Sequence, residues 1–232
     1  MFPLLLQHIC FLYSYNTYVS FTLTTRINAK YPEVHSEVAV KLFKEWRTQH
    51  DKTYRSTDEE WYRYGVFLDN VKVINSLNGL PKKHGSDSAH FGLTKFADLT
   101  LAEFRKTVLQ PPRPSFKIRK SNHTVKAPAS YDWTSQEGVV TSVKDQGAVG
   151  TCWAFAGLAN VEGGILEPVI CSAASLNHAV LLVGFDETSS GSPYWRIKNS
   201  WGTQWGESGF GRVIRGVGAC GINAEVTTAV LA

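Results

Sequence analysis

The chain has 232 residues, enough for one large domain or two modest ones with a substantial core. Its net charge of +4 is small and spread along the sequence, and no lysine- and arginine-rich block predicts binding to nucleic acid. No CxxC pair and no HExxH motif occurs, so neither a metal site nor another cofactor is expected. Seven tryptophans and nineteen glycines favour tight turns packed on large aromatic side chains over a long helical bundle.

Residues 1–34 are expected to be a leader or a disordered extension. Residues 1–14 carry two apolar clusters, but Gln7 and His8 interrupt them and no basic segment precedes them, so they make a weak signal peptide. The stretch is also too short and too polar to span a membrane, and no membrane association is expected. The glycosylation sequon at Asn122 fits a secretory route.

Two helices are predicted next. Ser36 caps the first, which covers Glu37 to Gln49. The second is longer and begins at Thr57, which forms a predicted capping box with Glu60. The first helix has apolar residues at helical spacing, namely Val38, Leu42, Phe43 and Trp46.

Six residues of the second helix share one face although four of them are polar. Their successive steps place them within an arc of roughly 100° at about 100° per residue. An ordinary amphipathic helix is the alternative, but it would not place charged and amide side chains on the packed face. Since buried polar groups need partners, we predict a hydrogen-bonded network that holds another helix. The six residues are Glu59, Arg63, Phe67, Asn70, Ile74 and Asn78.

A short strand and a third helix follow. His90–Phe96 is the predicted strand, and Thr100 with Glu103 caps a helix that runs to about Val108. Residues 110–126 are rich in proline and lysine, which breaks regular structure and leaves the backbone open to proteases. This connector is the clearest domain boundary in the chain.

Cys152 follows a glycine-rich turn and opens a small apolar run that favours a helix. A thiol at a helix N-terminus is stabilised as a thiolate, which is a strong nucleophile. Taken singly, Cys152, His178 and Asn199 could each be a structural residue. Their order within Cys-Trp-Ala-Phe, Asn-His-Ala-Val and Lys-Asn-Ser-Trp-Gly favours a catalytic set instead.

These motifs resemble the papain family of cysteine proteases. The polar helix face resembles the ERFNIN signature of papain-family propeptides, and Gly92–Asp98 is similar to their GxNxFxD motif, with Thr94 where Asn is usual. Residues 178–184 and 218–223 resemble the cathepsin F branch. The resemblance implies an α+β fold: a helical inhibitory pro-domain, then a papain-like domain with a nucleophile helix and a β-rich lobe.

The catalytic domain implied by the resemblance is internally truncated. His178 follows Cys152 by 26 residues, whereas the papain signature places the histidine about 130 residues or more after the cysteine. About 110 residues are therefore absent, and we place the junction near residues 163–164. The expected division is a pro-domain at 36–108, a linker or propeptide tail at 109–126, and a peptidase domain at 127–232.

The resemblance also assigns roles to the site residues. His178 would take the Cys152 proton, and Asn199 would orient the imidazole. Trp201 would shield that contact from water. Gln146 would donate to the oxyanion together with the Cys152 backbone N–H.

Further expectations concern the disulfide, the specificity pocket and the partners. Cys171 and Cys220 match positions that pair in relatives, so a disulfide and an oxidising compartment are expected; the alternative is two free thiols. Glu225 matches the floor of the S2 pocket, where a carboxylate would admit Arg or Lys at P2, unless it is a plain surface residue. The implied partners are peptide or protein substrates, the chain's own pro-domain and cystatin-type inhibitors, and the implied location is lysosomal or secreted.

Three functions therefore compete. The first is a papain-like endopeptidase precursor that uses Cys152, His178, Asn199 and Gln146. The second is a non-catalytic protein whose residues 36–126 inhibit or assist an intact relative. The third is a misfolded product without function.

Overall fold

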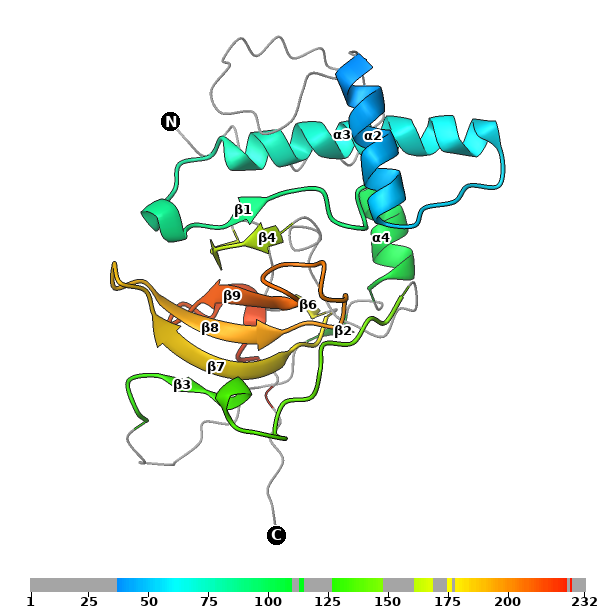
Figure 1. Ribbon diagram of the computed structural model, residues 1–232. Helices are drawn as coiled ribbons and strands as arrows, with labels where there is room; N and C mark the ends of the chain where they lie inside the picture. Colours follow the sequence, from blue (N-terminus) through cyan, green and yellow to red (C-terminus); the bar gives the residue numbers. More distant parts are fainter. Residues whose placement is uncertain are drawn as a thin grey trace.

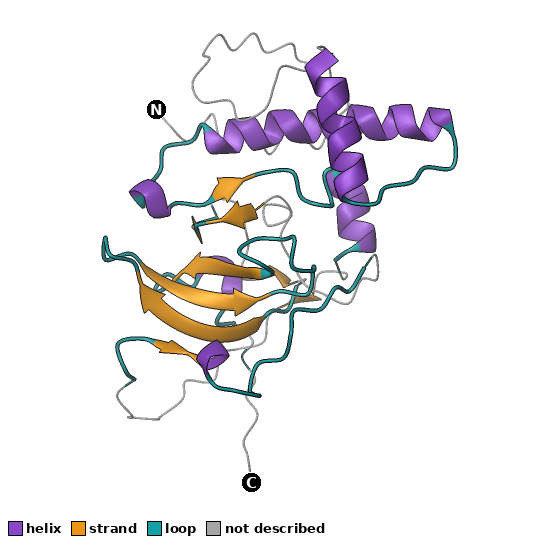
Figure 2. Cartoon of the chain, viewed as in Figure 1, coloured by secondary structure: helices purple, strands orange, loops and turns teal. Residues whose placement is uncertain are grey.

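The computed structural model describes residues 37–109, 113–114, 127–147, 161–168, 175–176, 178–224 and 226. As predicted, the fold is α+β (Figures 1 and 2). Helices α2, α3 and α4 lie on one side, the largest sheet lies on the other, and β1 runs between α3 and that sheet. The predicted leader and most of the connector fall outside the described residues.

Helix α2 (Glu37–Gln49) has the predicted bounds, but its buried face is set differently. Ala39, Phe43 and Trp46 are buried, whereas Val38 is 58% exposed. Phe43 and Trp46 pack against Phe67 of α3 with ring centroids 5.2 and 5.1 Å apart. The i, i+4, i+7 positions 39, 43 and 46 point at α3, and position 38 is turned away from them.

Helix α3 (Thr57–Asn78) is capped by Ser56 and not by Thr57 as predicted. Ser56 has extended backbone, and its side chain accepts from the Glu59 N–H at 3.2 Å. Glu59 reaches back to the Arg55 N–H at 2.8 Å, so the capping interaction lies one residue earlier than expected. Glu60 instead forms an ion pair with Arg47 of α2, which ties the two helices together.

The polar face of α3 holds the segment 91–99, which runs from the end of a strand into turns, where the sequence predicted another helix. Asn70 Nδ2 donates to the carbonyls of Ala97 and Leu99 at 2.8 and 3.0 Å. Asn78 donates to the Phe91 carbonyl at 2.8 Å and accepts from the Phe91 N–H at 2.9 Å. The end of a strand and the turns that follow it leave backbone groups unpaired, and the asparagine amides satisfy them.

The other members of this face take different parts. Arg63 donates to the Asp98 carbonyl at 3.0 Å and to Glu103 at 2.9 Å, so it links α3 to the start of α4. Phe67 and Ile74 are fully buried. Glu59 serves the cap of α3, where it accepts from the Arg55 N–H.

Strand β1 (His90–Phe91) is shorter than the predicted strand, because residues 95–98 form turns that lead into α4. Helix α4 (Leu101–Thr107) begins with the predicted capping box of Thr100 and Glu103. Its C-cap is Val108, where the sequence placed the helix end.

The largest sheet has the order β3-β7-β8-β9-β5. Its neighbours are antiparallel except for the parallel pair β5–β9. Two small sheets pair β1 with β4 and β2 with β6, both antiparallel. The strands are β2 (Arg113–Pro114), β3 (Tyr131–Asp132), β4 (Val161–Gly163), β5 (Ile165–Leu166), β6 (Ser175–Leu176), β7 (Leu181–Glu187), β8 (Pro193–Lys198) and β9 (Phe210–Ile214).

Residues 161–166, the docking strand, join the helical part to the large sheet. Their first half, β4, pairs with β1, and their second half, β5, pairs with β9. Gly164 lies between the halves at φ +82°, where a Cβ would meet the Ser88 carbonyl oxygen at 2.3 Å. Only glycine fits this left-handed backbone and close approach without strain.

Two apolar clusters form among the described residues. The first lies between α2 and α3 and contains only residues from 39–97. The second contains Phe96, Phe104, Val108, Leu109, Val161, Leu166, Trp201 and Trp205, and so draws on both halves of the chain. No described helix is long and apolar enough to cross a membrane.

Candidate active site

His178 and Asn199 meet at the adjacent ends of β7 and β8. The distance from His178 Nε2 to Asn199 Oδ1 is 2.8 Å. The Ser200 N–H also donates to Asn199 Oδ1, at 2.8 Å, which fixes this oxygen as an acceptor. His178 Nε2 must therefore carry the proton, and the lone pair of the neutral ring is on Nδ1.

Trp201 covers this pair. Its ring lies 4.7 Å from the His178 ring at an interplanar angle of 23°, and it is 1% exposed. Burial lowers the pKa of His178 to about 4, and the Asn199 hydrogen bond only partly opposes this effect. Nδ1 is buried without a hydrogen-bond partner among the described residues. The geometry thus presents a neutral imidazole with one free basic nitrogen.

Gln146 lies on a loop held against the end of β8. Its N–H donates to the Ser200 carbonyl at 2.8 Å, and its side-chain Oε1 accepts from the Ser200 hydroxyl at 2.7 Å. These contacts turn Nε2 toward Val108, whose carbonyl oxygen is 3.1 Å away. The side chain predicted to stabilise an oxyanion therefore already donates to a carbonyl at the end of α4.

The residue before Gln146 is also held by the helical part. Both carboxylate oxygens of Asp145 accept from Lys95. Burial would raise the pKa of Asp145, but the Lys95 contact outweighs it and holds that pKa below its usual value. The loop at residues 145–146 is thus held by contacts with two residues that precede the connector, Lys95 and Val108.

Several predicted site residues lie outside the described residues, namely Cys152, Cys171 and Glu225. Cys220 lies within the described residues and is disulfide-bonded. Its backbone is left-handed, with φ +55°. Its partner lies outside the described residues. The structure therefore brings together His178, Asn199, Trp201 and Gln146, and leaves the placement of the nucleophile untested.

The connector contributes one described pairing. Arg113 and Pro114 of β2 pair with Leu176 and Ser175 of β6, two residues before His178. The connector therefore forms a short strand, β2, which pairs with the chain just before His178.

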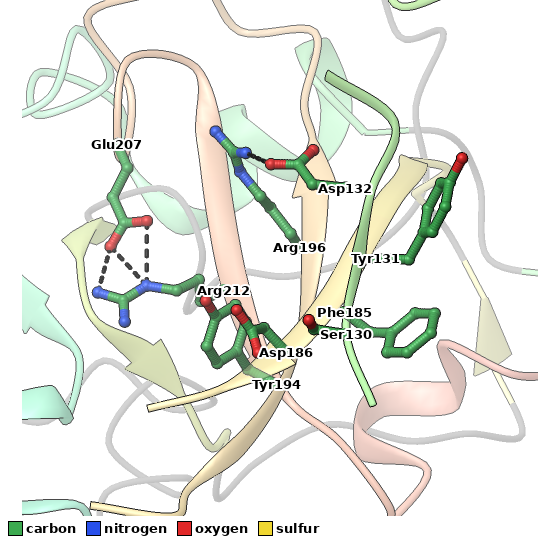
Figure 3. A pocket seen from close by; sticks show the side chains of 9 residues that line it. All are labelled: Ser130, Tyr131, Asp132, Phe185, Asp186, Tyr194, Arg196, Glu207 and Arg212. Carbon is green, nitrogen blue, oxygen red and sulfur yellow. Dashed lines mark hydrogen bonds and ion pairs between the residues drawn. The ribbon is translucent and has the colours of Figure 1, made fainter. Parts of the chain in front are cut away.

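A hollow of about 310 Å³ lies elsewhere, beside β3, β7, β8 and β9 (Figure 3). Arg196 pairs there with Asp132, and Arg212 pairs with Glu207. His178 and Gln146 do not line it, so we do not assign the reaction to it. Within the described part of the chain, no group of three or more His, Cys, Asp or Glu side chains could hold a metal ion.

Sequence reasoning missed Ser200, Asp145 and Val108. Ser200 and Asp145 are sequence neighbours of Asn199 and Gln146, so proximity to the motifs was the available signal. Val108 acts through its backbone carbonyl, which no side-chain pattern could have indicated.

Comparison with protein families finds two matches. The papain family cysteine protease model matches residues 127–166 and 161–230, and the cathepsin propeptide inhibitor domain (I29) matches residues 43–104. The two papain-family segments overlap at residues 161–166, which are the docking strand.

Curated relatives and solved structures agree with these matches. Mouse (Mus musculus) cathepsin F is 27% identical over 314 positions, covering 86% of this chain and 67% of the relative. Pea (Pisum sativum) cysteine proteinase 15A is 24% identical, covering 86% of this chain and 89% of the relative. Procathepsin L 3 of Tenebrio molitor superposes with a TM-score of 0.67 at 21% identity, covering 82% of this chain and 98% of that chain, which supports the fold.

The alignment with mouse cathepsin F is longer than the part of this chain that it covers. It spans 314 positions, whereas 86% of 232 residues is about 200. The difference, about 110 positions, has no counterpart here, which agrees with the internal truncation expected from the Cys152–His178 spacing.

Proposed function

Because the chain belongs to the papain family of cysteine protease precursors, we propose that it is the latent form of a thiol endopeptidase. The catalytic set would be Cys152, His178, Asn199 and Gln146. The observation that carries the proposal is the 2.8 Å contact between His178 Nε2 and Asn199 Oδ1, which leaves Nδ1 as the base. Trp201, stacked on the ring, would keep water from that contact.

The chemistry would begin with transfer of the Cys152 thiol proton to His178 Nδ1. The thiolate attacks the peptide carbonyl carbon, and the π electrons move to oxygen. Gln146 Nε2 and the Cys152 N–H donate to this oxyanion, and each such donor is worth roughly 3 kcal/mol. The carbon–nitrogen bond then breaks, and His178 returns its proton to the departing amine.

The second half regenerates the thiol. His178 takes a proton from water, and the resulting hydroxide attacks the thioester carbonyl. The carbon–sulfur bond breaks, the acid product leaves, and the proton returns to sulfur. Asn199 holds the imidazole in one orientation through both halves.

Residues 37–109 would inhibit this site in the same chain. Gln146 Nε2 donates to the Val108 carbonyl, so one of its two N–H groups is occupied before any substrate arrives. The β2–β6 pairing supports the expectation that the tail at 109–126 lies along the substrate path. A substrate carbonyl would have to displace both contacts.

The finer assignments belong to the same proposal. We place the pro-domain at 36–108 and the peptidase domain at 127–232. The disulfide of Cys220 would be made with Cys171. Glu225 would set a preference for basic side chains at P2, cystatin-type inhibitors would bind the mature form, and the protein would work in a lysosome or outside the cell.

The test is covalent labelling of the nucleophile. The full chain is expressed, acidified to allow processing, and treated with a peptidyl epoxide that alkylates activated thiolates. Labelling that is lost in Cys152→Ser and kept in the matched control Cys10→Ser supports the proposal. Absence of labelling in the unaltered chain would refute it.

A second candidate is a non-catalytic inhibitor of intact relatives. It is favoured by the apolar cluster between α2 and α3, which the helical part builds from its own residues. The same preparation tests it. Nanomolar inhibition of an intact cathepsin without epoxide labelling would favour this function over the first.

A further inference from the structure

The hollow of Figure 3 lies where a row of charged side chains crosses the large sheet. Asp132 of β3 lies opposite Gly184 of β7, Gly184 lies opposite Arg196 of β8, and Arg196 lies opposite Arg212 of β9. Side chains at directly opposite positions share one face of a sheet. Because Gly184 has no side chain, Arg196 reaches across β7 and pairs with Asp132. A long basic side chain therefore spans two strand spacings on this face.

The two arginines of this row are already neutralised. Arg196 donates to Asp132 and to the Thr134 hydroxyl, which is 3.0 Å away. Arg212 donates to both carboxylate oxygens of Glu207, at 2.6 to 3.1 Å, and this hydrogen bonding raises the pKa of Arg212. Since each guanidinium group is committed to a carboxylate, neither one is a free cation for an anionic ligand.

Asp186 is a third carboxylate in the hollow, and within the described part of the chain it makes no ion pair (Figure 3). Its Oδ1 accepts from the Glu187 N–H at 2.9 Å. Asp186 lies opposite Tyr194, whose pKa is raised by burial and then by the Asp186 charge, so the phenol stays neutral. Three carboxylates thus face two guanidinium groups, and the excess negative charge lies at Asp186. A cation is the complementary ligand.

The hollow extends to the free edge of the sheet, because residues 130–132 line it. β3 is the terminal strand of the sheet, and among the described residues it pairs with β7 alone. Residues 127–131 are exposed, and the register of β3 on β7 places Ser130 next to Asp186. An unpaired strand edge accepts an extended segment of another chain. Because serine is small, a long side chain from that segment can pass over Ser130 and reach Asp186.

We propose that this hollow binds an extended segment of another protein, whose lysine or arginine side chain pairs with Asp186. The segment would lie beside β3 as an added strand. The volume of about 310 Å³ is at the lower end for ligand sites, which suits one side chain. His178 and Gln146 do not line the hollow, so the proposal goes beyond the proposed function and does not depend on catalysis.

The experiment measures peptide binding to the uncut full chain. The nitrogen-15-labelled protein is titrated with acetyl-Thr-Val-Lys-Val-Thr-amide, and the backbone amide shifts are followed by NMR. The same peptide with norleucine in place of lysine is the matched control, since it lacks only the ammonium group. We expect saturable shifts at residues 130–132 and 184–186, and at least about tenfold weaker binding of the norleucine peptide. Equal affinities, or no saturable shift with the lysine peptide, would overturn the proposal.

Matched variants locate the charge that binds the peptide. Asp186→Asn keeps the shape of the side chain and should weaken binding at least about tenfold. Glu187→Gln removes the same charge from the adjacent exposed residue and should weaken binding less than about twofold. Equal losses would show a general charge attraction and overturn the site. Ser130→Arg, at an exposed position, should block the path and weaken binding at least about tenfold while Asp186 is kept.

The connector is another source of the same chemistry, because it contains Lys117, Arg119 and Lys120. Replacing all three by glutamine in the full chain should change the peptide affinity by less than about threefold. A gain of about tenfold or more would show that the chain's own connector competes for the hollow, and would overturn its assignment to another protein.

This result is separable from the proposed function. Peptide binding is measured without turnover, so it stays readable if Cys152 is not labelled. Conversely, intact epoxide labelling without peptide binding would overturn the binding site alone and leave the endopeptidase proposal standing.

Discussion

Replacement of Asn70 by alanine should destabilise the pro-domain by about 3–5 kcal/mol. Asn70 Nδ2 makes two hydrogen bonds, at 2.8 and 3.0 Å, to the carbonyls of Ala97 and Leu99. Each contributes about 1 kcal/mol net, and leaving two partly buried carbonyls unpaired adds about 1–3 kcal/mol. Against a total stability of about 5–15 kcal/mol, this loss is large enough to measure readily.

Urea unfolding followed by far-ultraviolet circular dichroism suits this measurement, because all described α-helices lie in the pro-domain. Lys72→Ala, on the same helix, is the matched control, since it removes only an exposed ion pair with Asp69. A loss in Asn70→Ala below about 0.5 kcal/mol, or equal to that of Lys72→Ala, would refute the argument that amide side chains hold the segment 91–99.

Three further predictions concern the site and the docking strand. Burial lowers the pKa of His178 from 6.5 to about 4, so the unfolded chain binds more protons than the folded chain between these pH values. The free energy of unfolding should therefore be highest above about pH 6.5 and fall toward pH 4. His178→Gln should flatten that part of the stability–pH curve. An unaltered curve would contradict this. Gly164→Ala, at φ +82° and against a backbone oxygen, should cost about 1–3 kcal/mol in urea unfolding, and more than Gly216→Ala, whose Cβ would meet nothing within 4 Å; equal losses would show that the close approach is unimportant. Lys95→Met should raise the pKa of Asp145, as read by carboxyl carbon-13 NMR, and an unshifted titration would argue against the contact.

Local sequence signals predicted the helices well. The bounds of α2 and the capping box of α4 were confirmed, because spacing and capping chemistry act within a few residues. The cap of α3 was wrong by one residue, since Ser56 and Thr57 are both good capping residues and only the backbone conformation chooses between them. The buried face of α2 was also predicted wrongly, because Val38 is apolar and was therefore expected to be buried, whereas it is exposed.

Contacts between distant segments were harder to predict from the sequence. The pattern on α3 indicated buried polar partners but not that they are backbone carbonyls of the segment 91–99. The packing of Phe96 and Phe104 on Trp201 joins residues about a hundred positions apart, and no periodicity reports such a contact. For this reason the sequence did not indicate the apolar cluster that the two halves share.

The docking strand bears on where, along this chain, the roughly 110 positions without a counterpart would be inserted. Residues 161–163 pair with the pro-domain and residues 165–166 pair with β9, so an insertion between Gly163 and Gly164 would split a strand that two sheets share. Extra residues placed before Val161 would leave both pairings intact. We therefore expect the coding junction, sought in genomic sequence for the roughly 110 absent codons, at or before Val161 and not at Gly163, where the sequence first suggested it.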